Sequence, residues 1–499
     1  MTERNCDILV VGGGGSGLVA AVRAAELSGK RVIVLEKAKK PGGGMLFAST
    51  MRTFGSQWQA DRGIRDQSND FIRQGMDLTF WKLDAKLVRR AVLSTGRFFD
   101  WYSRFELPEI LAKYEPRPYI FDIPVHGQPG PQQDGFHNGS GRLIVATMLR
   151  QCEARGIEVL TEHRAVDAEV ENGRITAIWA ETPEGRVRFG CRVCILSCST
   201  WIRNEAVMDK VMPAFRDLDI MPNAHQNPAY TGDGIPIAEK AGAFVDWDNF
   251  CLRIMGPMCA TGETSVFYPL SLSDYCILVD LTGRRFAAEP LVPRMDPFDT
   301  GHVLLKLPKG RSFFLFSQNI LERMVAESKS GTNEPGPFPK PPLPDTPVIH
   351  GWFRDAMAKG TKGVFMADSL DALAGQMGVD PAALARTVST YNISCAEGKD
   401  WDYFKDPKTM LPLAQGPYFA LAARLNTDGA FGGVAVNADM QAYRPDGSLV
   451  PGLYVTGDFA GGRHISLGGV KRQVLNDMSW ALSSGFLAGE SVAEALRNE

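Results

Sequence analysis

The segment DILVVGGGGSGLVAAVRAAELSGKRVIVLE, residues 7–36, contains the local pattern that decides the fold. It starts with the apolar run Asp7–Val11, passes through four glycines and continues into an Ala-rich stretch with helical spacing over 18–28. A second apolar run, residues 31–36, closes on Glu36. This order predicts a strand, a glycine-rich turn, a helix and a second strand, which is the βαβ unit of a parallel α/β sheet.

The glycines fill the pattern GxGxxG at Gly12, Gly14 and Gly17. The first permits the tight turn from strand to helix, the second lets the backbone approach a diphosphate, and the third lets helix and strand pack closely. The helix N-terminus then presents N–H groups and a positive dipole end to the phosphates. Glu36 lies 19 residues after Gly17, where a carboxylate accepts hydrogen bonds from a ribose diol and repels the 2′-phosphate of NADP. The segment therefore predicts a dinucleotide site rather than a structural glycine turn, and it leaves FAD and NAD both open.

The composition of the 499-residue chain is that of an ordinary globular protein, with 44% hydrophobic and 22% charged residues. Its length exceeds one ordinary core, so we expect two domains. The net charge of −3 gives no indication of binding to nucleic acid or to an anionic membrane surface. The start of the chain lacks a signal-peptide pattern, and no apolar run reaches the ~18 residues that span a bilayer. We therefore expect a cytoplasmic protein with no membrane partner.

Nine cysteines in a chain of this size are few, and the odd count favours free thiols over a disulfide framework. Cys191, Cys194 and Cys198 have the look of a metal or redox cluster. However, residues 193–196 have the pattern of a buried strand, whose alternation would place the thiols on different faces. We expect core cysteines and no metal site.

The rest of the chain alternates helical and β-type patterns. Residues 141–155 predict a helix, and later β-type stretches fit a mixed sheet attached to the first βαβ unit. The segment from 329 to 347 contains seven prolines between Pro335 and Pro347, which predicts an exposed loop. Strands are predicted at 157–160, 165–171, 174–182, 186–197, 418–437 and 453–458, and a long amphipathic helix over about 471–496.

Several further motifs give the chain a family resemblance. They are KAKKPGGG at 37–44, TGDGI at 231–235 with AEKAGA at 238–243, GRRF at 283–286 with Glu289, TV…YN…G.D over 387–400, and GLYVTGD at 452–458. In this order they resemble the fumarate reductase and succinate dehydrogenase flavoprotein superfamily, which is related to ketosteroid dehydrogenases and ene-reductases.

The resemblance implies an α/β fold with a Rossmann-like FAD-binding domain and a mixed sheet, interrupted by an α+β capping domain that holds the substrate. The implied boundaries are 1–247 for the first part of the FAD domain, 248–427 for the cap and 428–499 for the second part. Covalent flavin attachment in the family uses a His shortly after the GG segment. Residues 45–55 contain no His, so FAD is expected to be bound non-covalently.

The glycine motif and the resemblance together assign a set of FAD contacts. Asp458 is expected to hydrogen-bond the ribityl chain, and a helix starting near Gly469 to point its N-terminus at the pyrimidine side of the flavin, where it would stabilise negative charge. The predicted cofactor-binding residues are Gly12, Gly14, Gly15, Ser16, Gly17, Glu36, Lys37, Gly43, Gly44, Ser49, Val166, Asp233, Gly457, Asp458, Ser466 and Leu467.

In the family, hydride moves between flavin N5 and one carbon of a C–C bond beside a carbonyl or carboxylate, while an acid or base handles the proton on the other carbon. Residues 289–296 resemble the segment that carries the proton-donating Arg of fumarate reductases. Arg294 is therefore the candidate for proton transfer or for holding the carbonyl oxygen. A surface Arg with neither role is the alternative.

The residues that bind the dicarboxylate in the family are replaced. Arg253 and Asp428 stand where the family has His, and Ser466 stands where it has Arg, in a segment two residues shorter. Three changes in one site exclude fumarate as the expected substrate. Arg463 and His464 follow the GLYVTGD segment, which resembles the family's second FAD motif. His464 is either an acid or base, or a residue that holds the loop. Arg253, Arg463 and Asp428 are the further candidates for catalytic residues.

Other candidates stay open. Lys471 and Arg472 could face the flavin or pair with Asp477 or Glu490 on the helix surface. The residues considered as phenolic acids are Tyr230, Tyr268 and Tyr275.

The sequence therefore predicts an FAD-dependent oxidoreductase that acts on a C=C or CH–CH bond beside a carbonyl or carboxylate. A flavin oxidase using O2 and a catalytically silent flavin-binding subunit are the alternatives. The expected partners are a small unsaturated carbonyl or carboxylate compound and an external electron donor or acceptor, because no haem motif, iron–sulfur spacing or second dinucleotide motif is visible.

Overall fold

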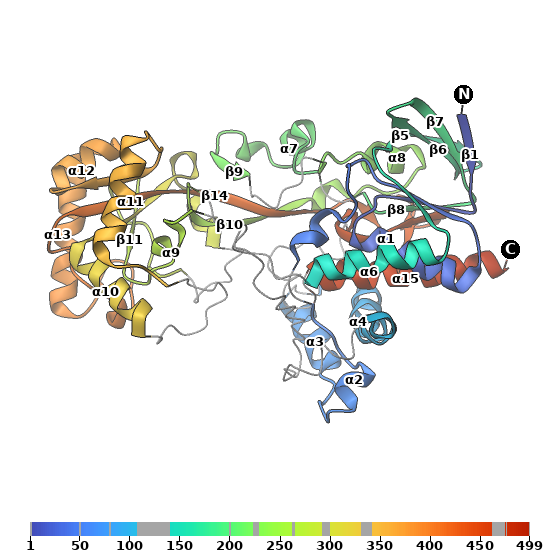
Figure 1. Cartoon of the computed structure of the whole chain (residues 1–499), viewed down its shortest axis with the longest axis horizontal. Helices are drawn as coiled ribbons and strands as arrows, with labels where there is room; N and C mark the ends of the chain where they lie inside the picture. Colours follow the sequence, from blue (N-terminus) through green and yellow to red (C-terminus); the bar gives the residue numbers. More distant parts are fainter. Residues whose placement is uncertain are drawn as a thin grey trace. The chain divides into compact units, whose positions relative to one another are not determined.

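The computed structural model divides the chain into two compact units (Figure 1). Unit 1 contains residues 1–213, 225–252 and 429–499, and unit 2 contains 214–224 and 253–428. The structure describes residues 2–48, 51–78, 81–106, 140–198, 201–222, 229–261, 265–291, 300–330, 342–461, 475 and 477–498.

Unit 1 is built on a six-stranded sheet in the order β16-β17-β8-β2-β3-β4. Its strands are β16 Gln441–Tyr443, β17 Leu449–Val455, β8 Val193–Leu196, β2 Ile8–Val11, β3 Val32–Leu35 and β4 Glu158–Leu160. All neighbours are parallel except β16 and β17. Every residue of β2, β3 and β8 is buried, which explains their unbroken apolar sequences, because a parallel sheet is covered on both faces. The predicted βαβ unit is confirmed.

Two long helices pack tightly in unit 1. Helix α1 (Gly15–Ser28) lies against both α15 (Asp477–Asn498) and α6 (Ser140–Ala154) (Figure 1). A Cβ atom on Gly485 would stand 2.3 Å from the carbonyl oxygen of Ser16, so this helix pair needs a glycine at the contact. The described part of unit 1 also contains the helices α2 Gln57–Ala60, α3 Ser68–Leu78, α4 Ala85–Glu106, α7 Glu205–Val211 and α8 Gly234–Lys240.

A second sheet of unit 1 has the order β1-β7-β6-β5, with β1 Thr2–Asn5, β7 Gly185–Gly190, β6 Arg174–Thr182 and β5 Arg164–Glu171. The prediction of one strand over 186–197 is wrong, because β7 and β8 belong to different sheets and the chain changes sheet at Cys191. Strand β1 was not expected in a polar segment. It forms because it pairs in parallel with β7, where Glu3 also accepts a hydrogen bond of 2.8 Å from Arg188.

Unit 2 contains a sheet in the order β10-β14-β12-β11, with β9 and β13 also paired to the long strand β14. The strands are β9 Ile220–Pro222, β10 Cys251–Cys259, β11 Ile277–Asp280, β12 Ser312–Ser317, β13 Val364–Ala367 and β14 Tyr418–Phe431. The helices are α9 Tyr268–Ser271, α10 Gln318–Ser330, α11 Thr346–Ala358, α12 Leu370–Met377 and α13 Pro381–Glu397. Stacked and edge-on rings of Phe316, Phe353 and Phe419 lie in its core.

Two further predictions need correction at their boundaries. Pro347 lies in the first turn of α11 rather than in a loop, which is the position where a helix tolerates proline. The C-terminal helix is described from Asp477 instead of residue 471, and 471–474 lie outside the described residues. In the part of the chain that the structure describes, no helix has the length and apolar character needed to cross a membrane.

Candidate functional site

The first and third glycines of the motif are required by the protein itself. Gly12 has φ +112°, and a Cβ there would stand 2.1 Å from the carbonyl oxygen of Ser197. A Cβ on Gly17 would stand 2.0 Å from the carbonyl oxygen of Gly12. Neither contact can be relieved, because both involve backbone atoms, so any larger residue would open the turn.

The second glycine of the motif is not required by contacts within the protein. Gly14 has φ −76°, which any residue adopts, and its Cβ would meet no heavy atom within 4 Å. Gly14 is also the N-cap of α1, where no side chain accepts a cap hydrogen bond and no acidic residue stands in the first turn. Open space beside an uncapped helix N-terminus fits a bound diphosphate, which would occupy the space and accept the N–H groups.

The predicted ribose acceptor is held next to this turn. Glu36 follows β3 and accepts hydrogen bonds from the backbone N–H of Gly13 (2.9 Å) and of Ala38 (2.7 Å). Burial of the carboxylate raises the pKa of Glu36, and these backbone donors only partly offset that effect. The acid is thus fixed in direction at the carboxyl end of its strand, as a ribose diol would require.

The GLYVTGD segment at 452–458 meets the GxGxxG turn at Ser16. The hydroxyl groups of Ser16 and Ser197 are 2.6 Å apart, and a Cβ on Gly457 would stand 2.7 Å from the Ser16 hydroxyl. The Gly457 N–H donates to Ser484 (3.0 Å), and its carbonyl accepts from the indole of Trp480 (2.8 Å). Two segments more than 400 residues apart therefore form one surface. Asp458 follows in this turn and is half-buried.

Lys37 and Asp233, both predicted cofactor contacts, are brought together as an ion pair of 2.8 Å. Arg164 donates two further hydrogen bonds of 3.1 Å to the same carboxylate. Burial alone would raise the pKa of Asp233, but the hydrogen bonds from Arg164 and Lys37 outweigh it and lower the pKa to about 2. This ion pair ties the end of β3 to the TGDGI segment.

The GG segment that follows lies against the same turn. Gly42 donates to the carbonyl of Gly13 (2.8 Å), and Gly43 and Gly44 begin a 3-10 helix at residues 43–47. A Cβ on Gly44 would stand 2.6 Å from the hydroxyl of Tyr230. A Cβ on Gly15 would likewise stand 2.5 Å from the Met45 side chain. Val166, another predicted contact, lies partly exposed in β5.

Several predicted residues cannot be placed. Arg253 lies in β10 and Asp428 in β14, but their side chains are outside the described residues. The predicted residues that lie wholly outside them are Ser49, Arg294, Arg463, His464, Ser466, Leu467, Lys471 and Arg472.

The alternative candidates can be placed in part. Glu490, a suggested partner of Lys471 and Arg472, accepts from Arg23 and Arg97. Tyr275 donates its hydroxyl to Glu327, and burial raises the pKa of that phenol. Tyr268 is buried at the start of α9, while Tyr230 lies beside Gly44.

Two polar groups at the carboxyl edge of the central sheet were not foreseen. The indole N–H of Trp201 and the hydroxyl of Thr456 are buried and have no hydrogen-bond partner within the described structure. Trp201 follows β8, and Thr456 follows β17 and directly precedes Gly457. Their residue types give no sequence signal, because Trp and Thr after a strand are ordinary.

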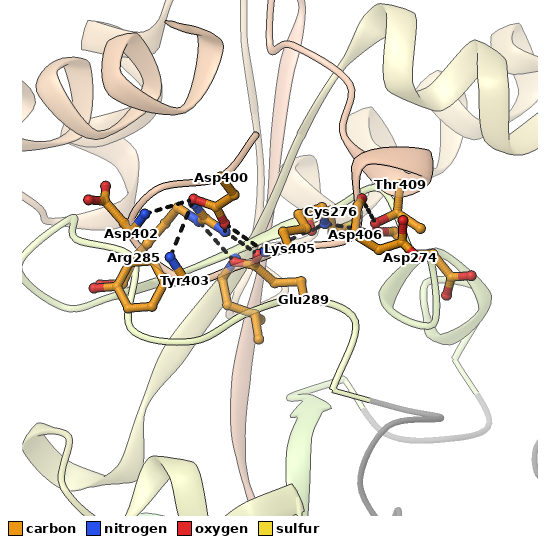
Figure 2. A network of polar contacts seen from close by, with 11 residues as sticks. Asp274, Cys276, Arg285, Glu289, Asp400, Asp402, Tyr403, Lys405, Asp406 and Thr409 are labelled. Carbon is orange, nitrogen blue, oxygen red and sulfur yellow. Dashed lines mark hydrogen bonds and ion pairs between the residues drawn. The ribbon is translucent and has the colours of Figure 1, made fainter. Parts of the chain in front are cut away.

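A different polar cluster lies inside unit 2 (Figure 2). Arg285 donates to Glu289 (2.6 Å) and to Asp400 (2.9 and 3.1 Å), and all three side chains are at most 5% exposed. Burial alone would lower the pKa of Arg285, but the two carboxylates outweigh it and raise the pKa. The predicted motifs GRRF…E and G.D thus meet in one closed ion cluster rather than at a ligand site.

Lys405 extends this cluster. Its ammonium donates to the carbonyls of Asp274 (2.8 Å) and Cys276 (3.0 Å), and it lies 3.9 Å from Glu289. Burial lowers the pKa of Lys405. The two cations and two carboxylates balance, so the cluster has no net charge to offer a ligand.

Four of the described cysteines, among them Cys194, are buried, while Cys191 and Cys198 are partly exposed. The eight described cysteines are free thiols, and burial raises the pKa of Cys194 well above its ordinary value. Among the described residues there is no group of His, Cys, Asp and Glu side chains that could hold a metal ion. A thiol with a raised pKa is a poor nucleophile and metal ligand.

Comparison with known proteins identifies the family. The model of the family described as "FAD binding domain" matches residues 7–469. The vinyl phenol reductase of Lactiplantibacillus plantarum is 24% identical over 468 residues, which cover 91% of this chain and 90% of that protein. The urocanate reductase of Eggerthella lenta is 25% identical over 478 residues, covering 91% of this chain and 70% of that protein.

A solved structure of a flavocytochrome c3 fumarate reductase in an open conformation has the same fold. It superposes with a TM-score of 0.72 at 21% identity, covering 98% of this chain and 78% of that chain. The predicted resemblance and the predicted α/β fold are therefore confirmed. The chain belongs to the FAD-binding family of flavin-dependent oxidoreductases, with FAD as its cofactor.

Proposed function

We propose that this protein is an ene-reductase or dehydrogenase that uses non-covalent FAD and acts on a C=C or CH–CH bond beside a carbonyl or carboxylate, with fumarate excluded. The observation that carries the proposal is the carboxyl edge of the unit 1 sheet, where the space beside Gly14 is open and Glu36 accepts from the neighbouring Gly13 N–H. Bound FAD supplies the N5 position that gives or accepts the hydride.

The reaction class is supported by the relatives. The relatives named vinyl phenol reductase and urocanate reductase each match over 91% of this chain, and both names denote the reduction of an unsaturated compound. The replacement of the three dicarboxylate-binding positions by Arg253, Asp428 and Ser466 argues for a substrate other than fumarate.

Arg294 is assigned the proton transfer or the polarisation of the substrate oxygen, and His464 is the second candidate. A guanidinium that is positioned against the developing negative charge lowers the barrier most when water is excluded. Arg253, Arg463 and Asp428 are the further candidates for the catalytic site, on the basis of their positions in the sequence.

Electrons are assigned to an external donor or acceptor, such as a separate reductase, reduced free flavin or a transiently bound nicotinamide. This assignment is supported by the sequence patterns alone. The same holds for two further parts of the proposal, namely that residues 248–427 form a cap and that the protein is cytoplasmic.

The test is stopped-flow oxidation of the anaerobically reduced holoenzyme. Reduced protein is mixed with enoates, enones and aryl acrylates, with fumarate as the negative control and air-saturated buffer as the oxidase control. We expect the flavin absorbance to return faster with one of these classes than with fumarate or oxygen.

Two results would contradict the proposal. Fast reoxidation by oxygen alone, with release of peroxide, would make the protein an oxidase. If no compound of the panel reoxidises the flavin, and fumarate and oxygen also fail, the result would favour a flavin-binding subunit without turnover.

A further inference from the structure

The indole of Trp201 buries a hydrogen-bond donor without satisfying it. The side chain is 1% exposed, and Nε1 has no partner in the described part of the structure. A buried N–H that has given up water without gaining an acceptor is costly, so native proteins rarely retain one. The indole therefore points to an acceptor that is not part of the polypeptide.

The loop that carries this indole is fixed. The carbonyl of Trp201 accepts from Asn204 N–H (2.7 Å), and the Asn204 side chain donates to the carbonyl of Thr231 (3.0 Å). The ring packs against Phe250 with centroids 5.3 Å apart, and its Cβ would lie 3.1 Å from a Cβ on Gly232. With both backbone and ring held, the N–H keeps one direction.

The indole also lies at the right edge of the sheet. Strand β8 pairs in parallel with β2 on one side and with β17 on the other. The segment after β2 is the Gly12–Gly17 turn, and the segment after β17 contains Thr456 and Gly457. Because the carboxyl ends of parallel strands meet at one edge, Trp201 follows the middle strand of the edge across which a dinucleotide lies.

Other buried indoles of unit 1 have acceptors within the protein. Trp101 donates to the Glu26 carboxylate (2.7 Å), and Trp480 donates to the carbonyl of Gly457 (2.8 Å). Both are as deeply buried as Trp201, so depth alone does not explain the missing partner. Trp201, unlike Trp101, follows a strand of the central sheet at its carboxyl edge, and at that edge the Trp480 N–H already has the Gly457 carbonyl as its acceptor.

We propose that Trp201 is an FAD-binding residue whose indole N–H donates a hydrogen bond to an acceptor atom of the bound cofactor. This contact lies beyond the glycine motifs and Glu36. It rests on FAD being bound at this edge and is independent of the reaction that the flavin carries out.

The test compares Trp201→Phe with Trp101→Phe, which remove the same N–H from two buried rings. FAD release from each purified holoenzyme is followed on dilution by the fluorescence of the free flavin. For Trp201→Phe we expect the dissociation constant of FAD to rise about fivefold to tenfold. For Trp101→Phe we expect an unchanged dissociation constant and a lower unfolding temperature, because that N–H is paired inside the protein.

An unchanged FAD dissociation constant in Trp201→Phe, with wild-type flavin content, would overturn the assignment while leaving the FAD site itself intact. Should the variant fail to fold, a structure of the wild-type holoenzyme decides the question. Nε1 within about 3.2 Å of an FAD nitrogen or oxygen supports the contact. Nε1 directed at a protein carbonyl or a water molecule excludes it.

Discussion

The Arg285 cluster of unit 2 and the carboxyl edge of the unit 1 sheet both arise from strong sequence motifs, yet their polar groups are satisfied in opposite ways. In the cluster, Arg285 donates to both Glu289 and Asp400, and with Lys405 near Glu289 the two cations balance the two carboxylates (Figure 2). At the edge, the space beside Gly14 is open, the N-terminus of α1 has no side-chain cap, and the Trp201 N–H has no acceptor in the described structure.

This difference between the two regions shows that a polar sequence motif can serve either the folded structure or the binding of a ligand. Polar residues that satisfy one another stabilise the folded structure, since breaking a buried ion pair leaves an uncompensated charge. A set that stays open is completed by a ligand. The first kind should respond to mutation in stability, and the second in cofactor affinity.

Arg294→Ala is expected to have the largest effect, because Arg294 is assigned to the chemistry. We expect the rate of flavin reoxidation by substrate to fall by about a hundredfold to ten-thousandfold, with flavin content unchanged. Stopped-flow kinetics of the reduced enzyme measure it, and Arg284→Ala serves as the matched control in unit 2. Wild-type rates in Arg294→Ala would move the assignment to His464.

Asp400→Asn should break the closed cluster. Asp400 accepts two hydrogen bonds from Arg285, and the neutral amide cannot balance that charge, so we expect a loss of about 3–5 kcal/mol in the free energy of unfolding. The FAD dissociation constant should not change. Urea denaturation and flavin release measure the two quantities.

The matched control for this variant is Asp439→Asn. Asp439 pairs with Arg90 at 2.9 Å on the surface, where an exposed ion pair contributes at most about 1 kcal/mol. Equal destabilisation by the two variants would show that the Arg285 cluster is no more important than a surface pair.

Gly14→Ala should act on the open edge alone. Its methyl group meets no protein atom, so we expect a loss of at most about 1 kcal/mol from the poorer N-cap. The FAD dissociation constant should rise at least about tenfold, because the methyl group would stand where the diphosphate approaches. Gly375→Ala, whose Cβ also meets open space, is the control for flavin release. Unchanged FAD affinity in Gly14→Ala would remove the reason for a glycine there.

The smallest effect concerns the pH dependence that Asp233 gives to stability. Its pKa is lowered to about 2 in the folded protein, so its stabilisation is present above the ordinary pKa of about 3.9 and is lost as the pH falls towards 2. Asp233→Asn should therefore differ from the wild type above pH ~4 and approach it below that value. Denaturation curves over this range check it, and a constant difference at all pH values would contradict the assigned cause.

The sequence could predict the βαβ unit, because the buried strands β2 and β3 are continuous apolar runs and the glycines have fixed spacing. It could not predict strand β1, whose residues are polar and gain their structure from pairing with β7. The prediction from sequence also joins β7 and β8 into one strand, because local patterns do not reveal that a chain passes from one sheet to another.

The site shows the same limit. Glu36 and the glycines were predictable from spacing, since their roles follow from backbone geometry. The pairing of Lys37 with Asp233 depends on segments almost 200 residues apart, and the missing acceptor of Trp201 depends on what the fold leaves unfilled. Neither has a local sequence signal.

The central claim is that FAD completes the open edge of the unit 1 sheet. The most direct measurement is the flavin content of the purified native protein, from the absorbance of the flavin released on denaturation. We predict one FAD per chain, released by denaturation without proteolysis because it is not covalently bound. A colourless protein that also fails to take up FAD on titration would contradict the account.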